Sequence, residues 1–382
     1  MNPKDNSTPV SVLIVGIGGY GYYYLKTLLE EILESTAKLC GVIDPFADQS
    51  GLFPEVTKRD IPIFAEIEDF YRAGHTADLV VISSPIQYHV PQSCIALNNG
   101  SNVLCDKPLS ATVEEADELI RVRDKSGKWV MIGYQWSYSS AIQDLKRDIQ
   151  RGMFGKPKTF KALCLWPRDD TYYNRNNWAG KIKDSGGRWI LDSPANNAMA
   201  HFIHNLFYLS GEDQYSSSTP EEVTAELHRV NPIETYDTAI CRIVTHNDVE
   251  LLFYGSHTTK TTKNPIFNLE FENAIIDFGD AGSTIRIISG ESRLKDYGSP
   301  DDDHQFKKLL DAVECVRRPS PIVCSPEAAR SQTLCINAMQ EFLPSASTLP
   351  ASTIHRDEKE KRWWVEGLDD LLSDCYNRGI MP

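Results

Sequence analysis

Four glycines within six residues place the strongest constraint on the fold of this chain. The segment Gly16-Ile17-Gly18-Gly19-Tyr20-Gly21 follows an apolar run at residues 10–15 and precedes a helical pattern at residues 22–34. Glycines at this spacing permit a tight turn, close approach of the backbone to a pyrophosphate, and close packing of helix on strand. The pattern therefore predicts a strand, a phosphate-binding turn and a helix whose N-terminus faces the phosphates.

The first third of the chain alternates between apolar runs and helical patterns. Continuous apolar runs are typical of parallel strands that are covered on both faces. We expect strands at residues 10–15, 39–43, 79–83, 102–105 and 129–132, and helices at residues 22–34, 66–73, 90–98 and 113–126. This order is that of the α/β class and predicts a doubly wound Rossmann domain over residues 1–135.

From about residue 139 the chain has short segments in which polar and apolar residues alternate. This alternation is typical of antiparallel strands with one covered face. We expect strands at residues 159–166, 222–230, 238–245, 250–257, 267–271, 274–278 and 284–289, and helices at residues 141–151, 305–316, 327–342 and 364–376. Residues 136–382 are thus predicted to form an α+β domain with a large, mainly antiparallel sheet. Its C-terminal helix could pack back on the first domain, and residues 345–361 are expected to form a loop.

Composition and charge exclude several classes of protein. The formal net charge of −14 argues against nucleic acid as a partner, because phosphate binding needs clustered Lys and Arg. No run reaches the ~18 apolar residues of a membrane span. The polar residues 1–9 lead directly into a strand, which argues against a signal peptide. The nine scattered cysteines fit a reducing compartment, so we expect a cytoplasmic protein without membrane partners.

An acidic residue ends the second predicted strand. Asp44 lies 23 residues after Gly21, where a carboxylate would accept hydrogen bonds from the adenosine ribose hydroxyls of a dinucleotide. Together with the glycine-rich turn, this acid predicts dinucleotide binding. Because an acid at this position disfavours a ribose phosphate, we expect NAD in preference to NADP.

Two further segments follow apolar strands. Ser83-Ser84-Pro85, with His89, follows one strand, and Cys105-Asp106-Lys107-Pro108-Leu109 follows the next. Both are expected at the carboxyl edge of the sheet, where α/β proteins bind ligands. We therefore expect cofactor contacts there and a working role for the lysine, from residues Ser84, Pro85, His89, Asp106 and Lys107.

These segments resemble the Gfo/Idh/MocA superfamily of oxidoreductases, named after glucose–fructose oxidoreductase, inositol dehydrogenase and a rhizopine catabolism protein. The matching segments are G-I-G-G-Y-G, V-I-D-P, I-S-S-P-I-Q-Y-H, V-L-C-D-K-P-L, I-G-Y-Q-W and H-F-I-H-N-L-F-Y-L-S-G. The resemblance implies that Lys107 hydrogen-bonds the reacting hydroxyl and the nicotinamide ribose, and that Gln135 contacts the cofactor. The family usually has Glu before this lysine, and Asp106 is one methylene shorter. A dimer or tetramer, formed through an uncovered face of the second sheet, is also implied.

The resemblance further implies a catalytic histidine in the second domain. Counting from Asp192 places Asn196 at the family's histidine position. Counting back from the end of the following helix places His201 there and His204 at a second acid, with about five extra residues after Asp192. We prefer the second register, because it keeps an imidazole for proton transfer near neutral pH. Asp192, His201 and His204 are thus catalytic candidates.

The histidine pair has two other interpretations. His201 and His204 are three residues apart, so on a helix they share one face. They could form a metal site with Asp192 as third ligand, or a structural pair held by backbone groups. We expect proton transfer and no metal.

Residues 168–180 are rich in Arg, Tyr, Asn and Trp, which can stack on sugar rings and bind hydroxyls. An ordinary surface loop is the alternative. The expected substrate-binding residues are Tyr134, Trp136, Arg175, Trp178 and Asn197.

The resemblance implies an NAD(P)-dependent dehydrogenase or reductase that acts on CH–OH groups. Its expected substrate is a secondary hydroxyl, or the matching ketone, of a sugar, cyclitol or related polyol. Two alternatives stay open: an NAD-dependent glycoside hydrolase of the same superfamily, and a non-catalytic NAD-binding regulatory protein.

Overall fold

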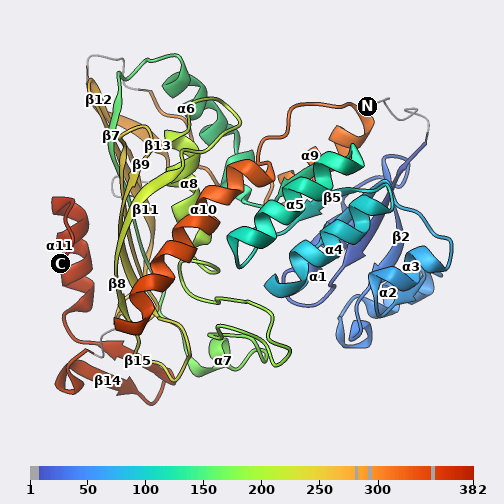
Figure 1. The fold of residues 1–382 in the computed structure, drawn as a ribbon, viewed down its shortest axis with the longest axis horizontal. Helices are drawn as coiled ribbons and strands as arrows, with labels where there is room; N and C mark the ends of the chain where they lie inside the picture. Colours follow the sequence, from blue (N-terminus) through green and yellow to red (C-terminus); the bar gives the residue numbers. More distant parts are fainter. Residues whose placement is uncertain (1–7, 280–282, 291–294, 346–348) are drawn as a thin grey trace. The chain divides into compact units, whose positions relative to one another are not determined.

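The computed structural model describes residues 8–279, 283–290, 295–345 and 349–382. The chain forms two compact units (Figure 1). The first unit contains residues up to 138 and residues 304–329; the second contains residues 139–303 and 330–382. The predicted division near residue 135 did not include this return of the chain to the first unit.

A six-stranded sheet forms the centre of the first unit, in the order β3-β2-β1-β4-β5-β6. All neighbouring strands are parallel, which confirms the predicted Rossmann sheet. The strands are β1 (Val10–Val15), β2 (Ala37–Ile43), β3 (Ile63–Phe64), β4 (Leu79–Ile82), β5 (Asn102–Cys105) and β6 (Val130–Ile132). The two-residue edge strand β3 was not predicted.

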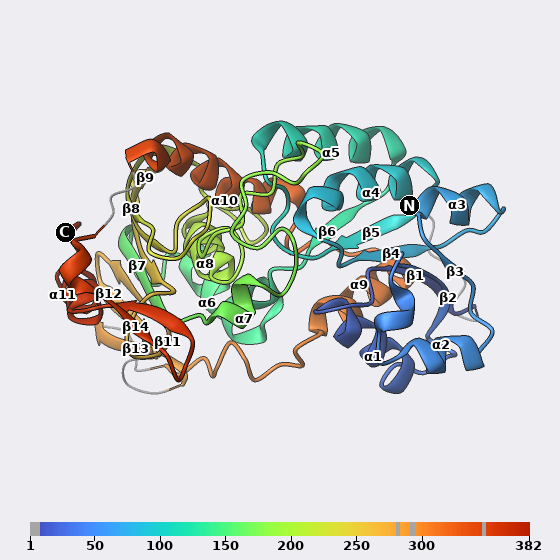
Figure 2. The same ribbon diagram turned by 90° about the horizontal axis from the view of Figure 1, so that it is seen from below.

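Helices cover both faces of this sheet, as Figure 2 shows. One face carries α1 (Gly21–Glu30), α2 (Phe53–Lys58) and α9 (Lys307–Arg317), and the other carries α3 (Ile67–Arg72), α4 (Ile86–Asn98) and α5 (Val113–Ser126). Coverage on both sides explains why β1 and β4 are apolar throughout. Because α9 contacts β1, β4 and β5, the returning segment completes one face of the sheet.

Local sequence fixes both ends of α5. The Thr112 hydroxyl accepts a hydrogen bond from the backbone N–H of Glu115, and the Glu115 carboxylate accepts one from the backbone N–H of Thr112. This reciprocal pair satisfies N–H groups that have no partner within the helix. Gly127 ends the helix with a φ of 67°, a conformation that glycine adopts without steric cost.

A seven-stranded sheet dominates the second unit, in the order β13-β12-β11-β7-β10-β9-β8. Its strands are β7 (Pro157–Leu165), β8 (Pro220–His228), β9 (Thr238–Thr245), β10 (Glu250–Ser256), β11 (Lys263–Phe271), β12 (Ala274–Phe278) and β13 (Ile285–Gly290). The predicted mainly antiparallel sheet is confirmed, with one parallel pair, β7 and β10.

The helices of the second unit are α6 (Ser140–Gln150), α7 (Asp170–Tyr173), α8 (Ala200–Ser210) and α11 (Leu368–Arg378), while α10 (Pro326–Met339) begins in the first unit and ends in the second. The loop expected at residues 345–361 contains a strand in its described part. This strand, β14 (Ile354–Asp357), pairs with β15 (Arg362–Val365) in a hairpin. Residues 346–348 lie outside the described residues.

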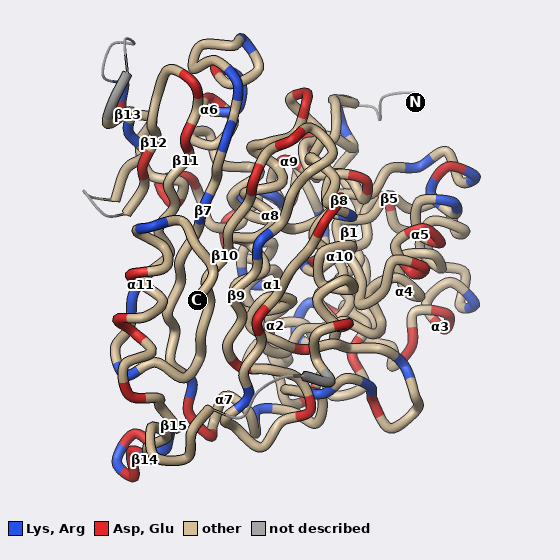
Figure 3. Tube along the Cα trace, turned by 60° about the vertical axis from the view of Figure 1, so that its left-hand side comes forward, with Lys and Arg blue, Asp and Glu red and all other residues tan. Residues whose placement is uncertain are grey.

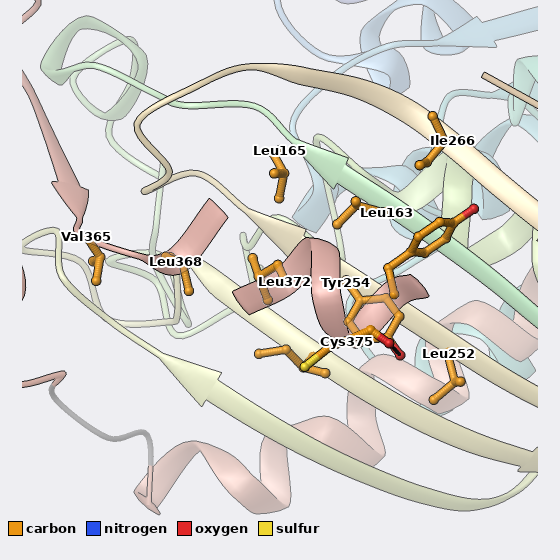
Figure 4. Packing of buried hydrophobic residues seen from close by; sticks show 11 residues of the cluster. Leu163, Leu165, Leu252, Tyr254, Ile266, Val365, Leu368, Leu372 and Cys375 are labelled. Carbon is orange, nitrogen blue, oxygen red and sulfur yellow. Dashed lines mark hydrogen bonds between the residues drawn. The ribbon is translucent and has the colours of Figure 1, made fainter. Parts of the chain in front are cut away.

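The C-terminal helix α11 packs on the sheet of its own unit, and its packing on the first domain stays a prediction. It contacts β7 and β10, and α8 contacts the same strands on the opposite face (Figure 1). Figure 4 shows the apolar cluster beneath α11, which includes Leu163, Leu165, Leu252, Tyr254, Leu368, Leu372 and Cys375. The sheet face expected to be uncovered therefore carries a helix at its centre.

Acidic and basic side chains are interspersed along the trace of both units (Figure 3). Within the described ranges, no helix combines the length and the hydropathy that crossing a bilayer requires.

We predict that Leu372→Ala destabilises the second unit by about 2–5 kcal/mol, because Leu372 is completely buried under α11 and its loss leaves a cavity. Leu371→Ala, on the exposed side of the same helix, is the control and should change stability by less than ~0.5 kcal/mol. Urea unfolding measures both. Equal destabilisation by the two variants would contradict the packing of α11.

Candidate functional site

The glycine-rich turn joins β1 to α1, as predicted. A Cβ atom on Gly21 would lie 2.0 Å from the carbonyl oxygen of Gly16, so this turn requires glycine. A Cβ atom on Gly18 or Gly19 would meet no protein atom within 4 Å. Open space thus lies over the turn, beside a helix N-terminus where Tyr20 makes no side-chain cap. This arrangement fits a pyrophosphate held by backbone N–H groups.

Asp44 follows β2 and is bonded to the glycine-rich turn. Its Oδ2 accepts a hydrogen bond from the Ile17 N–H at 2.8 Å, and its Oδ1 accepts one from the Phe46 N–H at 2.8 Å. The carboxylate therefore holds the turn against the second strand. Its contact with a ribose stays a prediction.

His89 connects the loops that follow β4 and β5. Its Nδ1 lies 2.8 Å from the carbonyl oxygen of Pro108, and its Nε2 lies 2.9 Å from that of Ser84. The side chain is buried, and burial lowers the pKa of His89. The structure gives His89 a positioning role; direct contacts of His89, Ser84 and Pro85 with the cofactor stay predictions.

A buried lysine that the sequence analysis missed holds the Asp106 loop. Lys308, on α9, donates hydrogen bonds to Asp106 Oδ1 at 3.1 Å and to the Gly133 carbonyl at 3.0 Å. The Tyr24 hydroxyl donates to the same carboxylate oxygen at 3.3 Å. Burial opposes the charge of Lys308, but Asp106 and Tyr20 outweigh burial and raise its pKa.

The residues around Asp106 differ in accessibility. Lys107 and Gln135 are half-buried, so both can reach a ligand at the carboxyl edge of the sheet. Tyr134 is completely buried and Trp136 nearly so. This burial favours packing roles, and direct contact of the two side chains with substrate stays a prediction.

Asp192 connects several of the predicted substrate-binding residues of the second unit. Its Oδ1 accepts a hydrogen bond from Asn197 Nδ2 at 2.7 Å, and its Oδ2 accepts one from the Gly180 N–H at 2.6 Å. Arg175 Nη2 lies 3.6 Å from Oδ2. Arg175 also stacks on Trp178, with its Cζ 5.0 Å from the ring centroid. Asp192, Arg175, Trp178 and Asn197 are therefore brought together, with Asp192 as their anchor.

The two histidines of α8 lie in different environments. His201 is half-buried in the first helical turn, whereas His204 is buried and stacks on Tyr208. Burial, with a contribution from Lys146, lowers the pKa of His204 to about 3. Burial favours a packing role for His204, and its catalytic role stays a prediction.

The surroundings of Asn196 do not favour the alternative alignment, in which Asn196 takes the position of the family's catalytic histidine. Its side-chain amide is buried, donates to the Ile190 and Leu191 carbonyls, and accepts a hydrogen bond from Gln332. These contacts support the register that selects His201, whose catalytic role stays a prediction. Among the described residues, no group of three or more His, Cys, Asp or Glu side chains could hold a metal, so the metal interpretation of His201 and His204 has no support.

The ends of β7 and β10 bring together two residues that the sequence analysis did not select. Because the two strands are parallel, Arg168 and His257 lie at the same edge of the second sheet, and the Arg168 N–H donates to the His257 carbonyl at 3.0 Å. The Tyr173 hydroxyl lies 3.2 Å from His257 Nδ1. Burial, with the charges of Arg168 and Arg175, lowers the pKa of His257 well below its usual value. The position of His257 directly after an apolar strand was the only sequence signal.

Comparisons with known proteins agree with this geometry. Residues 10–134 match the GFO_IDH_MocA family, described as an oxidoreductase family with an NAD-binding Rossmann fold. A scyllo-inositol 2-dehydrogenase (NAD(+)) of Bacillus subtilis (strain 168) is 29% identical over 156 residues, which are 40% of this chain and 44% of that relative. A 2,7-anhydro-N-acetylneuraminate hydratase of Mediterraneibacter gnavus is 22% identical over 312 residues, 80% of this chain and 77% of that relative.

Solved structures share the fold of both units. The WlbA dehydrogenase of Bordetella pertussis, crystallised with NADH and UDP-GlcNAcA, superimposes with a TM-score of 0.74 at 19% identity, over 90% of this chain and 99% of that one. The fold and the glycine-rich turn agree with the family match. Residues 10–134, which make up most of the first unit, match the Gfo/Idh/MocA family of oxidoreductases with an NAD-binding Rossmann fold.

Proposed function

We propose that the protein binds NAD, in preference to NADP, and interconverts a secondary hydroxyl and a ketone of a sugar, cyclitol or related polyol. The observation that carries this proposal is the open space over Gly18 and Gly19, beside the uncapped N-terminus of α1. The family match supports the cofactor, and the dehydrogenases among the relatives support the reaction. We assign the cofactor to the first unit and the substrate to the second, within a homodimer or homotetramer.

The reaction divides into hydride transfer and proton transfer. When bound, the nicotinamide cofactor supplies or accepts the hydride. Lys107 donates a hydrogen bond to the reacting oxygen, and His201 takes up the hydroxyl proton as the carbonyl forms. Asp106 and Lys308 hold the loop that carries Lys107, and Asp192 holds the loop of Arg175 and Trp178 in place.

A second candidate is a reaction without net oxidation. A relative whose similarity extends over 80% of this chain is named a hydratase. An NAD-dependent glycoside hydrolase, which oxidises, eliminates, adds water and reduces again, would use the same proton-transfer groups. Release of nitrophenol from glycosides without accumulation of NADH would identify this chemistry.

We predict that Gly18→Ala weakens NAD binding by roughly tenfold or more, equivalent to about 1.4 kcal/mol, because the methyl group occupies the space assigned to the pyrophosphate. Folding should be unchanged, since the added Cβ meets no protein atom within 4 Å. Gly51→Ala, where the Cβ makes an ordinary contact at 3.5 Å with Tyr22, is the control. Calorimetric titration with NAD measures the affinities, and unchanged affinity in Gly18→Ala would contradict the site.

Turnover tests the proposed reaction. We expect NADH formation with at least one member of a sugar and cyclitol panel, and losses of roughly 10²–10⁴-fold in kcat for Lys107→Ala and His201→Ala. NAD affinity in His201→Ala should stay close to that of the wild type, because this residue belongs to the second unit. Full turnover in both variants would show that neither residue handles the proton. Tight NAD binding without any turnover would favour the regulatory alternative.

Removing the buried cation should affect both stability and activity. Lys308→Met leaves the Asp106 carboxylate without its buried ion-pair partner, so we expect a loss of about 3–5 kcal/mol in the stability of the first unit and a lower kcat. The double variant Lys308→Met/Asp106→Asn removes both charges and should recover much of the stability. Unfolding and steady-state kinetics measure the two effects. Additive losses in the double variant would rule out a direct pair.

A further inference from the structure

Two arginines of the second unit share one aromatic ring. The Cζ atoms of Arg168 and Arg175 lie 4.8 and 3.9 Å from the ring centroid of Tyr172. Each guanidinium also faces a tryptophan: Arg168 lies 5.6 Å from the Trp166 centroid, and Arg175 lies 5.0 Å from the Trp178 centroid. Cation–π contacts of this kind are attractive and orient both guanidinium planes. An aromatic ring carries no net negative charge, however, so these contacts do not neutralise the arginines.

The acidic groups of this region are bonded to other partners. Asp169 accepts from the Tyr172 N–H, Asp170 accepts from both Nη atoms of Arg356, and Asp192 accepts from Gly180 and Asn197 and lies 3.6 Å from Arg175. Within the described part of the chain, no carboxylate forms an ion pair with Arg168, and its buried Nε has no hydrogen-bond acceptor. Of the two guanidinium groups, only that of Arg175 therefore has a carboxylate partner.

A buried imidazole lies within the same cluster. His257 is 1% exposed, its ring makes an edge contact with Tyr172, and its Nδ1 faces the Tyr173 hydroxyl. Among the described residues, nothing hydrogen-bonds its Nε2. Since a buried polar atom normally has a partner, this nitrogen points to a ligand group that the cluster would bind.

We propose that Arg168 and Arg175 bind a carboxylate of the substrate, which makes the substrate a sugar acid or a related polyol acid. A guanidinium is planar and can donate two parallel hydrogen bonds to a carboxylate. Trp166 and Trp178 present aromatic surface for the apolar face of a sugar ring, and His257 Nε2 can bond a neighbouring hydroxyl. This assignment rests on the proposed action on sugars or polyols and narrows it to their acids.

The test compares sugars that are matched except for the carboxylate. D-glucuronate with D-glucose, and D-galacturonate with D-galactose, are titrated calorimetrically into the full chain in the presence of NAD. Each acid should bind about ten- to a hundredfold more tightly than its neutral partner. Arg168→Gln should remove this preference. Arg151→Gln removes an exposed arginine at the end of α6 and should leave the preference unchanged.

The other possible results of these titrations distinguish a carboxylate from a phosphate as the anionic group of the ligand. Equal affinity for acids and neutral sugars, or no binding of either acid, overturns the proposal. Binding of D-glucose 6-phosphate without binding of either uronate also overturns it, because the cluster would then be a phosphate site. An unchanged melting temperature of Arg168→Gln shows that the loss is local, as expected for a side chain whose Nε makes no hydrogen bond in the described part of the chain.

Turnover is measured separately from these titrations. Uronate binding that depends on Arg168, without oxidation of any sugar, would contradict the proposed reaction and support the carboxylate site. NADH formation from neutral sugars, unaffected by Arg168→Gln, would support the reaction and contradict the carboxylate site.

Discussion

The buried ion pair between Lys308 and Asp106 joins segments that are 202 residues apart in the chain. A buried charge is costly unless it is paired and hydrogen-bonded, so this contact strongly restricts where α9 can sit on the sheet. The same ammonium group donates to the Gly133 carbonyl, which ties the loop after β6 to the loop after β5. The backbone that carries Lys107 is thus fixed by a residue outside the region that the family comparison matches. The loop that carries Lys107 and the returning helix α9 therefore depend on each other for their positions.

The second unit depends in a similar way on one departure from antiparallel pairing. Strands β7 and β10 run parallel, so their carboxyl ends meet and carry Arg168 and His257 to one edge. The loop that follows β7 is then held by Asp192 through Gly180 and Asn197. A rigid anchor beneath an aromatic and cationic loop is the arrangement expected of a binding surface on a fixed scaffold.

Features set by neighbouring residues could be predicted from the sequence. The parallel strands, the glycine-rich turn and α5 follow from continuous apolar runs, glycine spacing and a capping box. Features set by distant partners could not. Lys308 and His257 contact their partners only because segments far apart in the chain meet in the fold. The parallel pairing of β7 with β10 does not change the alternation of polar and apolar residues, so the sequence pattern could not reveal it. The three-residue spacing of His201 and His204 predicted a shared face if the segment is helical, as it is in α8, but it could not show that His204 is the more deeply buried of the two.

The return of the chain to the first unit has a consequence for synthesis. Until α9 has left the ribosome, strands β1, β4 and β5 lack part of the cover on one face, although every strand of their sheet has already been made. The nascent Rossmann domain would therefore expose apolar surface while the whole second sheet is translated. We therefore expect the first unit to reach its final packing only after most of the second unit has been synthesised.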